Sequence, residues 1–176
     1  HDFQGYMDIV GKDLLLKRLD ELFTIEMDEN IPGAHDIQGR IGAYWHGNEP
    51  CHNLAFLYNQ LGQQWQCQKW IRTIASHFYG DEPGSLSGND DCGQMSAWYI
   101  FACMGFYPVA PNSNVYSIGS PCIKAMKLKL SNGKMIEMIA DNWSSRNIYV
   151  KELYVNGKKH TSSYLKYDDV CNGVKL

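Results

Sequence analysis

The sequence predicts an α+β protein in which helices come first and antiparallel strands follow. Through most of residues 1–110, apolar side chains recur every three to four positions, which is typical of helices that bury one face. After residue 111 the apolar period changes to two, and Asn-Gly dipeptides separate the alternating runs, which is typical of β-hairpins. We therefore expect a helical part over residues 1–110 and an antiparallel β region over residues 111–176.

Composition narrows the class of protein. The chain has 176 residues, of which 44% are hydrophobic and 20% are charged, and this balance is typical of a folded domain or of parts of two domains. The formal net charge of -3 provides no basic surface of the kind that binds nucleic acid. No run of 18 apolar residues occurs, so we expect no membrane-spanning segment.

The first residue and the cysteines bear on processing and compartment. The chain begins at His1 without an apolar leader, so we expect it to be part of a longer polypeptide. None of the six cysteines forms a C-x-x-C pair, which disfavours a zinc ribbon or a thioredoxin-like motif. Buried thiols and disulfides both remain open, and disulfides would imply an oxidising compartment. Residues 142–144 fit the N-glycosylation sequon.

The first elements are predicted as follows. Residues 1–10 resemble the tail of a structure that begins upstream. Residues 12–23 form an amphipathic helix, whose apolar stripe is Leu15, Leu16, Leu19, Leu22 and Phe23. Residues 24–35 form a polar loop with a turn at Pro32-Gly33. Residues 36–47 are punctuated by glycine and form an irregular approach to the next segment.

Three more helices are predicted in the helical part. Pro50 suits the first turn of a helix that runs to about Leu61, where Gly62 ends it. Residues 65–79 form a second amphipathic helix, and a loop over residues 80–88 follows.

The last of these helices covers residues 91–104 and ends at Gly105. It is apolar on nearly all sides, so it should be buried. The large faces carried by Trp65, Trp70 and Trp98 need partners, so we expect this helical part to be incomplete by itself.

The β region is expected to hold five to six strands of usual length. Residues 124–130 and 134–140 alternate in polarity and flank an Asn-Gly turn, which predicts a hairpin. Residues 149–155 form another alternating run that leads into Asn156-Gly157.

Two polar segments carry the chemistry. Residues 45–52 read WHGNEPCH, and residues 88–98 read GNDDCGQMSAW. Each places acidic and amide side chains where a glycine or proline fixes the start of a helix. The polar groups therefore lie at helix ends, and we expect the two segments to form two walls of one polar pocket.

Asp91 has two interpretations. With Gln94 three residues later it matches a capping box, which is a purely structural role. That role does not explain Asn89 and Asp90 beside it. A carboxylate at a helix N-terminus has its ionised form favoured by the helix dipole, which suits a general base that activates water.

Glu49 lies in a cluster of oxygen and nitrogen donors with His46, Asn48 and His52. A structural polar network is one interpretation. Zinc is disfavoured because the two histidines are six positions apart and no H-E-x-x-H motif occurs. Oxygen-rich side chains suit a hard cation such as Ca²⁺. Two carboxylates on opposite walls of a pocket are the minimal equipment for glycoside hydrolysis.

The motifs resemble those of glycoside hydrolase family 92, the calcium-dependent exo-α-mannosidases. The resemblance covers the whole chain, and its specific blocks are HGNEPCHNLAFLYNQLGQQWQCQKWIR, GNDDCGQMSAWYIFACMGFYPVAP and YSIGSP. It implies a partial (α/α)6 toroid for residues 1–110, followed by C-terminal antiparallel strands. It also implies an N-terminal β-sandwich that lies outside this chain, and a location that is secreted, periplasmic or at the cell surface.

The resemblance implies release of terminal α-linked mannose, with α-1,2 linkages expected, by calcium-assisted inversion. Asp91 is then the general base, with Asn89 beside it in the catalytic group. Glu49 is either the acid or, where a glutamate upstream of this chain is the acid, a ligand of mannose or calcium. The side chains expected to bind substrate are His46, Asn48, His52, Asp90 and Gln94. Those expected to hold Ca²⁺ are Glu49, Asn48 and Asp91.

Departures from the family pattern keep other functions open. Cys51 and Asn53 replace the usual serine and second histidine of the first block, and Ala43 and Trp45 stand where glutamine and alanine are common. One alternative is a mannose-binding relative without catalysis. Another is a glycoside phosphorylase on a similar toroid. A third is a fragment that is inactive without the upstream domains. The expected partners are mannose-containing glycans and those missing domains.

Overall fold

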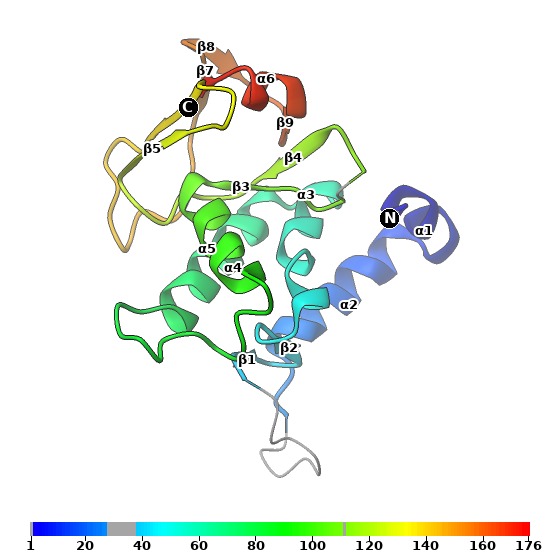
Figure 1. The fold of residues 1–176 in the computed structure, drawn as a ribbon. Coiled ribbons are helices and arrows are strands. Elements are labelled where there is room, and N and C mark those ends of the chain that lie inside the picture. The colour runs from blue at the N-terminus through cyan, green and yellow to red at the C-terminus, as the bar shows by residue number, and fades with distance from the viewer. Residues whose placement is uncertain (1, 28–37, 111) are drawn as a thin grey trace.

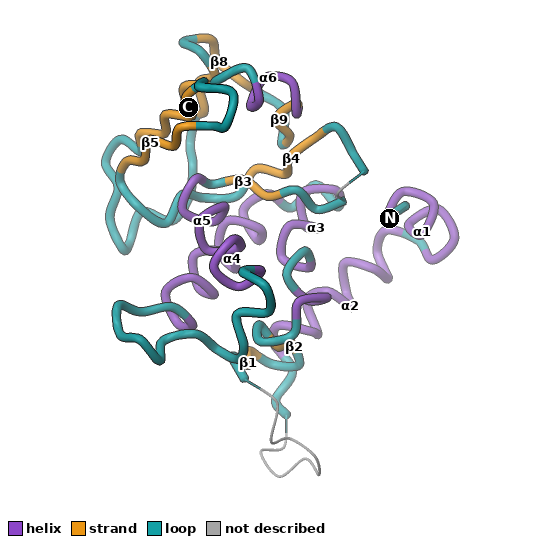
Figure 2. Tube along the Cα trace, in the orientation of Figure 1, coloured by secondary structure: helices purple, strands orange, loops and turns teal. Residues whose placement is uncertain are grey.

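The computed structural model describes residues 2–27, 38–110 and 112–176, with helices gathered in one half and short strands in the other (Figure 1). This confirms the α+β class, and Figure 2 shows the change from helix to strand along the chain. The (α/α)6 toroid and the boundary at residue 111 stay predictions. The predicted turn at Pro32-Gly33 and residue 111 itself lie outside the described residues. No described helix is long and apolar enough to cross a membrane.

The two long amphipathic helices form where their patterns predict them. Helix α2 covers Lys12–Thr24 and buries three positions of its apolar stripe, Leu15, Leu19 and Phe23. Helix α4 covers Gln64–Phe78 and also packs its apolar face inward. A short helix α1, Phe3–Val10, precedes them, and Asp2 caps it by accepting a hydrogen bond from the Gly5 N–H.

The predicted continuous helix over residues 50–61 is wrong. That stretch contains the 3₁₀ turns η2 (Glu49–Cys51) and η3 (Leu54–Phe56) and one α-helical turn, α3 (Leu57–Gln60). The carbonyl of His52, which a regular helix would pair with the N–H of Phe56, instead accepts the indole N–H of Trp98 at 3.0 Å. The N–H of Phe56 turns to the carbonyl of Asn53, one residue closer.

Helix α5 covers Gln94–Met104, so it begins three residues later than predicted and ends at Gly105 as predicted. Its central indole, on Trp98, is fully buried, as the all-round apolar pattern requires. Trp70 is also buried, whereas Trp65 is 51% exposed. Of the three tryptophans expected to need partners, only Trp65 leaves a large exposed face among the described residues.

The strands pair mostly with their neighbours in sequence. A small hairpin, β1 (Arg40–Ile41) with β2 (Tyr44–Trp45), lies in the stretch predicted as irregular. The predicted hairpin around residues 131–133 is confirmed as β5 (Ala125–Lys129) paired with β6 (Met135–Ile139).

The C-terminal strands differ in detail from the prediction. Strand β10 (Val174–Lys175) pairs with β6 in parallel, so the β region is not wholly antiparallel. Residues 149–152 are not a strand, and only β7 (Leu153–Val155) pairs with β8 (Lys158–His160). The described residues 112–176 hold seven strands, β4 to β10, where five to six were expected.

The remaining strands form a three-stranded sheet beside the helices. Its order is β3 (Phe106–Tyr107), β4 (Val115–Ile118) and β9 (Tyr164–Lys166), and all its pairs are antiparallel. A short helix α6 (Tyr167–Cys171) follows β9 directly.

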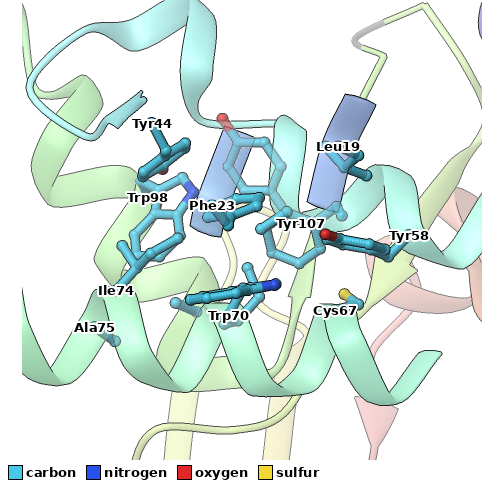
Figure 3. Packing of buried hydrophobic residues seen from close by; sticks show 14 of the residues in the cluster. Leu19, Phe23, Tyr44, Tyr58, Cys67, Trp70, Ile74, Ala75, Trp98 and Tyr107 are labelled. Carbon is cyan, nitrogen blue, oxygen red and sulfur yellow. The ribbon is translucent and has the colours of Figure 1, made fainter. Parts of the chain in front are cut away.

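The hydrophobic core divides into two clusters. In the larger one, the Phe23 ring of α2 stacks on Tyr44 at 4.8 Å and on Trp70 at 4.6 Å between ring centroids (Figure 3). The smaller cluster lies under the sheets and includes Phe106 and Leu165. The larger cluster packs below the two polar segments and so supports the candidate site.

Polar side chains of the helical part bind the backbone of the β region. The guanidinium of Arg72 on α4 donates to the carbonyls of Pro121 at 2.7 Å and Ser144 at 2.8 Å. The Asn59 amide of α3 donates to the hydroxyl of Ser117 at 2.7 Å. The two parts are therefore joined by directional bonds as well as by apolar packing.

Candidate functional site

The two polar segments meet through a pair of glycines. A Cβ added to Gly47 would lie 2.5 Å from the carbonyl oxygen of Ser87. A Cβ added to Gly88, whose φ is 109°, would lie 3.3 Å from the Cα of Gly47. The backbones therefore approach to a distance that only glycine allows at both positions. This contact brings Glu49 and Asp91 to the same place from segments about forty positions apart.

The loop before α5 holds Asp91 in an unusual backbone conformation. Asp91 and Cys92 have φ of 46° and 58°, and Gly93 follows with φ of 90°. Two successive non-glycine residues in the left-handed region cost conformational energy and persist only where the surroundings fix them. The run turns the Asp91 side chain outward, and its residue is exposed.

The carboxyl groups of Glu49 and Asp91 lie within hydrogen-bonding reach of each other. This contact lowers the pKa of Glu49 and raises the pKa of Asp91. The pair therefore shares a proton more readily than two separate carboxylates, because two negative charges at short range repel each other. In the part of the chain that the structure describes, Oε1 of Glu49 is buried and has no hydrogen-bond partner.

The predicted capping box is wrong. The N-cap of α5 is Gly93, which offers no side chain. Asp90 takes over the capping role: its Oδ1 accepts the N–H of Ser96 at 3.0 Å and the hydroxyl of Ser96 at 2.8 Å. Asp90 was expected to bind substrate, but this oxygen is already occupied by the helix. Asp91 is thereby left free of a capping bond.

Asn48 and Asn89 flank the carboxylate pair, and both are exposed. Asn48 precedes η2 but makes no side-chain capping bond there. Their amide groups are therefore open to a ligand, as expected for Asn48 in substrate or metal binding and for Asn89 in the catalytic group.

His46 lies beneath the surface of the site in this structure, and its contact with substrate stays a prediction. It is fully buried, and its ring nitrogens meet the hydroxyls of Tyr44 and Tyr79, both at 2.7 Å. Tyr79 donates its own proton to the carbonyl of Met95, so it accepts from Nε2–H of His46, and Tyr44 donates to Nδ1. Burial lowers the pKa of His46 to about 3.

His52 and Gln94, which were predicted to bind substrate, bond to protein partners in this structure. His52 is 1% exposed, and its Nε2 donates to the carbonyl of His46 at 2.9 Å. The amide nitrogen of Gln94 donates to Nδ1 of His52 and to the hydroxyl of Tyr107, both at 3.1 Å. The side chains of His52 and Gln94 thus bond to each other, and this hydrogen bond connects the two segments.

Sequence reasoning missed the tyrosines that surround the histidines. Tyr44, Tyr79 and Tyr107 come from three different elements and meet only in the fold. Tyr44 directly precedes the first segment, but no local spacing connects Tyr79 or Tyr107 to either segment. Beside them, Trp98 is fully buried, and Tyr99 stacks on Tyr79 at 4.5 Å between ring centroids.

The carboxylate pair has the chemistry of a partial site for a hard cation. Two adjacent carboxylates and the unpaired buried oxygen of Glu49 are oxygen donors of the kind that Ca²⁺ takes. Among the described residues, however, no group of three or more His, Cys, Asp and Glu side chains is arranged to hold a metal ion. The donors fit calcium in kind, and a complete shell would need further oxygens from amides, water, substrate or other parts of the polypeptide.

A cavity of about 880 Å³ lies elsewhere and is lined by residues of the β region such as Asp141, Trp143 and Tyr149. Neither Glu49 nor Asp91 lines this cavity.

Comparison with known proteins decides the family. The family model described as "Glycosyl hydrolase family 92 catalytic domain" matches residues 1–176. The chain belongs to this family. Its matches in family 92 include an α-mannosidase of Bacteroides thetaiotaomicron that was solved in complex with mannoimidazole. That structure is 70% identical, with a TM-score of 0.95 over 98% of this chain and 23% of the other.

Two more distant relatives also match this chain along its whole length. An inverting mannosidase of Bacteroides thetaiotaomicron is 32% identical, with a TM-score of 0.81 over 100% of this chain and 25% of the other. A protein of Arthroderma benhamiae described as an uncharacterized secreted glycosidase is 29% identical over 100% of this chain and 21% of its own length. The chain thus spans about a quarter or less of the length of these relatives.

Proposed function

We propose that this chain forms part of an exo-α-mannosidase that hydrolyses terminal α-linked mannose, with α-1,2 linkages as the expected substrate. The observation that carries the proposal is the meeting of Glu49 and Asp91 at the junction of the two polar segments. Membership of family 92, in which matched structures are named as mannosidases, supports this substrate class.

Asp91 is the general base in this proposal. It is exposed, it makes no capping bond, and its contact with Glu49 raises its pKa. A raised pKa makes the ionised carboxylate a stronger acceptor for a proton of the attacking water. Asn89 lies two positions before it on the same loop and presents an amide that can orient that water.

We propose that Glu49 is not the acid that works opposite Asp91. Acid and base of an inverting glycosidase stand roughly 6.5–9.5 Å apart so that a water fits between base and sugar, whereas these two carboxyl groups are within hydrogen-bonding reach. We therefore assign the acid to a part of the polypeptide outside this chain. Glu49, with its unpaired buried oxygen, is left for binding a mannose hydroxyl or calcium.

Calcium is part of the proposal. Glu49, Asp91 and Asn48 would hold it, and it would supply positive charge near the hydroxyls of the sugar. The chain's own residues orient the site: the glycine contact fixes the two loops, and Asp90 secures the start of α5. We place the enzyme outside the cytoplasm, in line with the secreted description of the fungal relative.

The test is mannose release from an α-1,2-mannobioside by the full-length polypeptide, followed by NMR. We expect β-mannose to appear first, as inversion requires, and we expect EDTA to lower the rate and added Ca²⁺ to restore it. Asp91→Asn should lower kcat by at least about 100-fold, because it removes the base. Asp141→Asn, an exposed carboxylate in the β region, is the matched control and should leave kcat unchanged.

Other outcomes would identify the alternatives. Normal turnover in Asp91→Asn would contradict the role of Asp91. Mannose binding without release would favour a non-catalytic relative. Release that requires phosphate would favour a phosphorylase. Release by residues 1–176 alone would mean that this chain contains its own acid.

A further inference from the structure

One of the hydrogen bonds between the two polar segments joins equivalent positions. His52 comes three residues after Glu49, and Gln94 comes three residues after Asp91. The bond from Nε2 of Gln94 to Nδ1 of His52 is 3.1 Å long. The bond therefore joins the two loops three residues after each carboxylate, on the buried side of the site.

The direction of this bond is fixed by the other partners of the two side chains. Nε2 of His52 faces the carbonyl oxygen of His46, so it must carry the ring proton. Nδ1 is then an acceptor in the neutral ring. Gln94 must present its amide nitrogen to it, and the second hydrogen of that nitrogen goes to the hydroxyl of Tyr107. One tautomer and one amide orientation satisfy the whole set.

The backbone of His52 strengthens the same connection. Its carbonyl accepts the indole N–H of Trp98, one turn further along α5. His52 thus bonds to its own segment through Nε2 and to α5 through both Nδ1 and its carbonyl. At 1% exposure, it has no surface left for a sugar.

We infer that Gln94 and His52 are positioning residues that hold the Asp91 loop and the Glu49 loop at a fixed separation, without contacting substrate. The inference rests on the proposed function for its effect on catalysis. Its structural content does not depend on that function. The Asp91 loop is strained at two successive residues, Asp91 and Cys92, so it needs an anchor next to it to stay in place.

The matched variants are Gln94→Met and Tyr107→Phe. Gln94→Met keeps the size of the side chain and removes the bond to His52. Tyr107→Phe removes only the bond between the Gln94 amide and the Tyr107 hydroxyl, so it is the control. The first measurement is hydrogen–deuterium exchange of residues 88–93 in the full-length polypeptide. We expect faster exchange in Gln94→Met and wild-type exchange in Tyr107→Phe. Equal exchange in all three proteins would overturn the inference.

The second measurement separates positioning from substrate contact. A misplacement of about 1 Å costs up to about 100-fold in rate, so Gln94→Met should lower kcat by about 10- to 100-fold with KM changed less than about threefold. A raised KM with normal kcat would instead assign Gln94 to substrate binding and overturn the inference. If the wild-type polypeptide releases no mannose, the proposed function fails and the exchange experiment still decides the positioning role.

A conservative pair at position 52 covers the case in which Gln94→Met does not fold. The Oδ1 of an asparagine can replace Nδ1 as acceptor for Gln94, whereas the amide of a glutamine replaces Nε2 as donor to His46. We expect residues 88–93 to exchange more slowly in His52→Asn than in His52→Gln. We also expect kcat to be higher in His52→Asn. The reverse order would show that the bond within the first segment matters and the bond between segments does not.

Discussion

At the scale of single residues, His46 shows how burial changes the role of a polar side chain. Its ring packs against His52 at 4.7 Å and against the edge of Trp98 at 4.4 Å between centroids. Desolvation is the largest cause of its lowered pKa, and the neighbouring His52 adds to it. A charged imidazolium would be unfavourable here, so the residue acts as a neutral connector between two tyrosine hydroxyls.

The lowered pKa of His46 predicts a dependence of stability on pH. The unfolded side chain takes up a proton near pH 6.5, whereas the folded one does so only near pH 3. The contribution of neutral His46 is therefore complete above pH 6.5 and is lost as pH falls toward 3, by up to about 1.4 kcal/mol per pH unit. Urea unfolding at pH 7 and pH 5 measures it. His46→Gln should lose less stability between these pH values than wild type, and an equal loss would contradict the prediction.

The cysteines also belong to this scale. All six are free thiols in the structure, of which Cys67 and Cys103 are buried and Cys92 is exposed. The interpretation as buried thiols therefore fits some of them and not Cys92. Burial raises the pKa of the Cys67 thiol well above its usual range, so this side chain behaves as an apolar group in the core.

At the scale of elements, the contact between the loops at Gly47 and Gly88 controls the site. We expect Gly47→Ala to push the two segments apart, because its Cβ would meet the carbonyl oxygen of Ser87 at 2.5 Å. The expected cost is about 1–3 kcal/mol of folding stability, with a loss of kcat on an α-mannoside.

The control lies in the loop between α4 and α5, which also contains Gly88. Gly84 has no atom within 4 Å of an added Cβ, so Gly84→Ala should leave both the melting temperature and kcat near wild type. Thermal unfolding and mannoside kinetics of the two variants check the prediction. Similar behaviour of the two would mean that close approach of the backbones at Gly47 is not required.

At the scale of the whole molecule, Arg72 connects the helical part to the β region. Arg72 is 9% exposed, and its guanidinium donates to two carbonyls and lies 5.5 Å from the centroid of the Trp143 ring. Arg72→Met keeps much of the apolar length but leaves both carbonyls without this donor. We expect a loss of about 2–3 kcal/mol and faster proteolysis of residues 140–152.

Arg146→Met is the matched control, because Arg146 is exposed in the same region. Urea unfolding and limited proteolysis compare the two variants. If Arg72→Met is as stable and as resistant to proteolysis as Arg146→Met, the apolar core alone holds the two parts together.

The sequence by itself determined the elements whose signals are local. Helices α2 and α4 follow from apolar periodicity, and the β5–β6 hairpin follows from its Asn-Gly turn. The family and the two polar segments also follow from contiguous motifs, which tertiary structure does not alter.

Only the tertiary structure decided how the candidate site is built. Contacts between distant residues broke the predicted helix at His52, gave the cap of α5 to Asp90, and buried His46 beneath the site. In each case a side chain or carbonyl is claimed by a partner from another element, and no spacing along the chain specifies that partner. The physical reason is that buried polar groups must find hydrogen bonds wherever the fold supplies them, even against local preference.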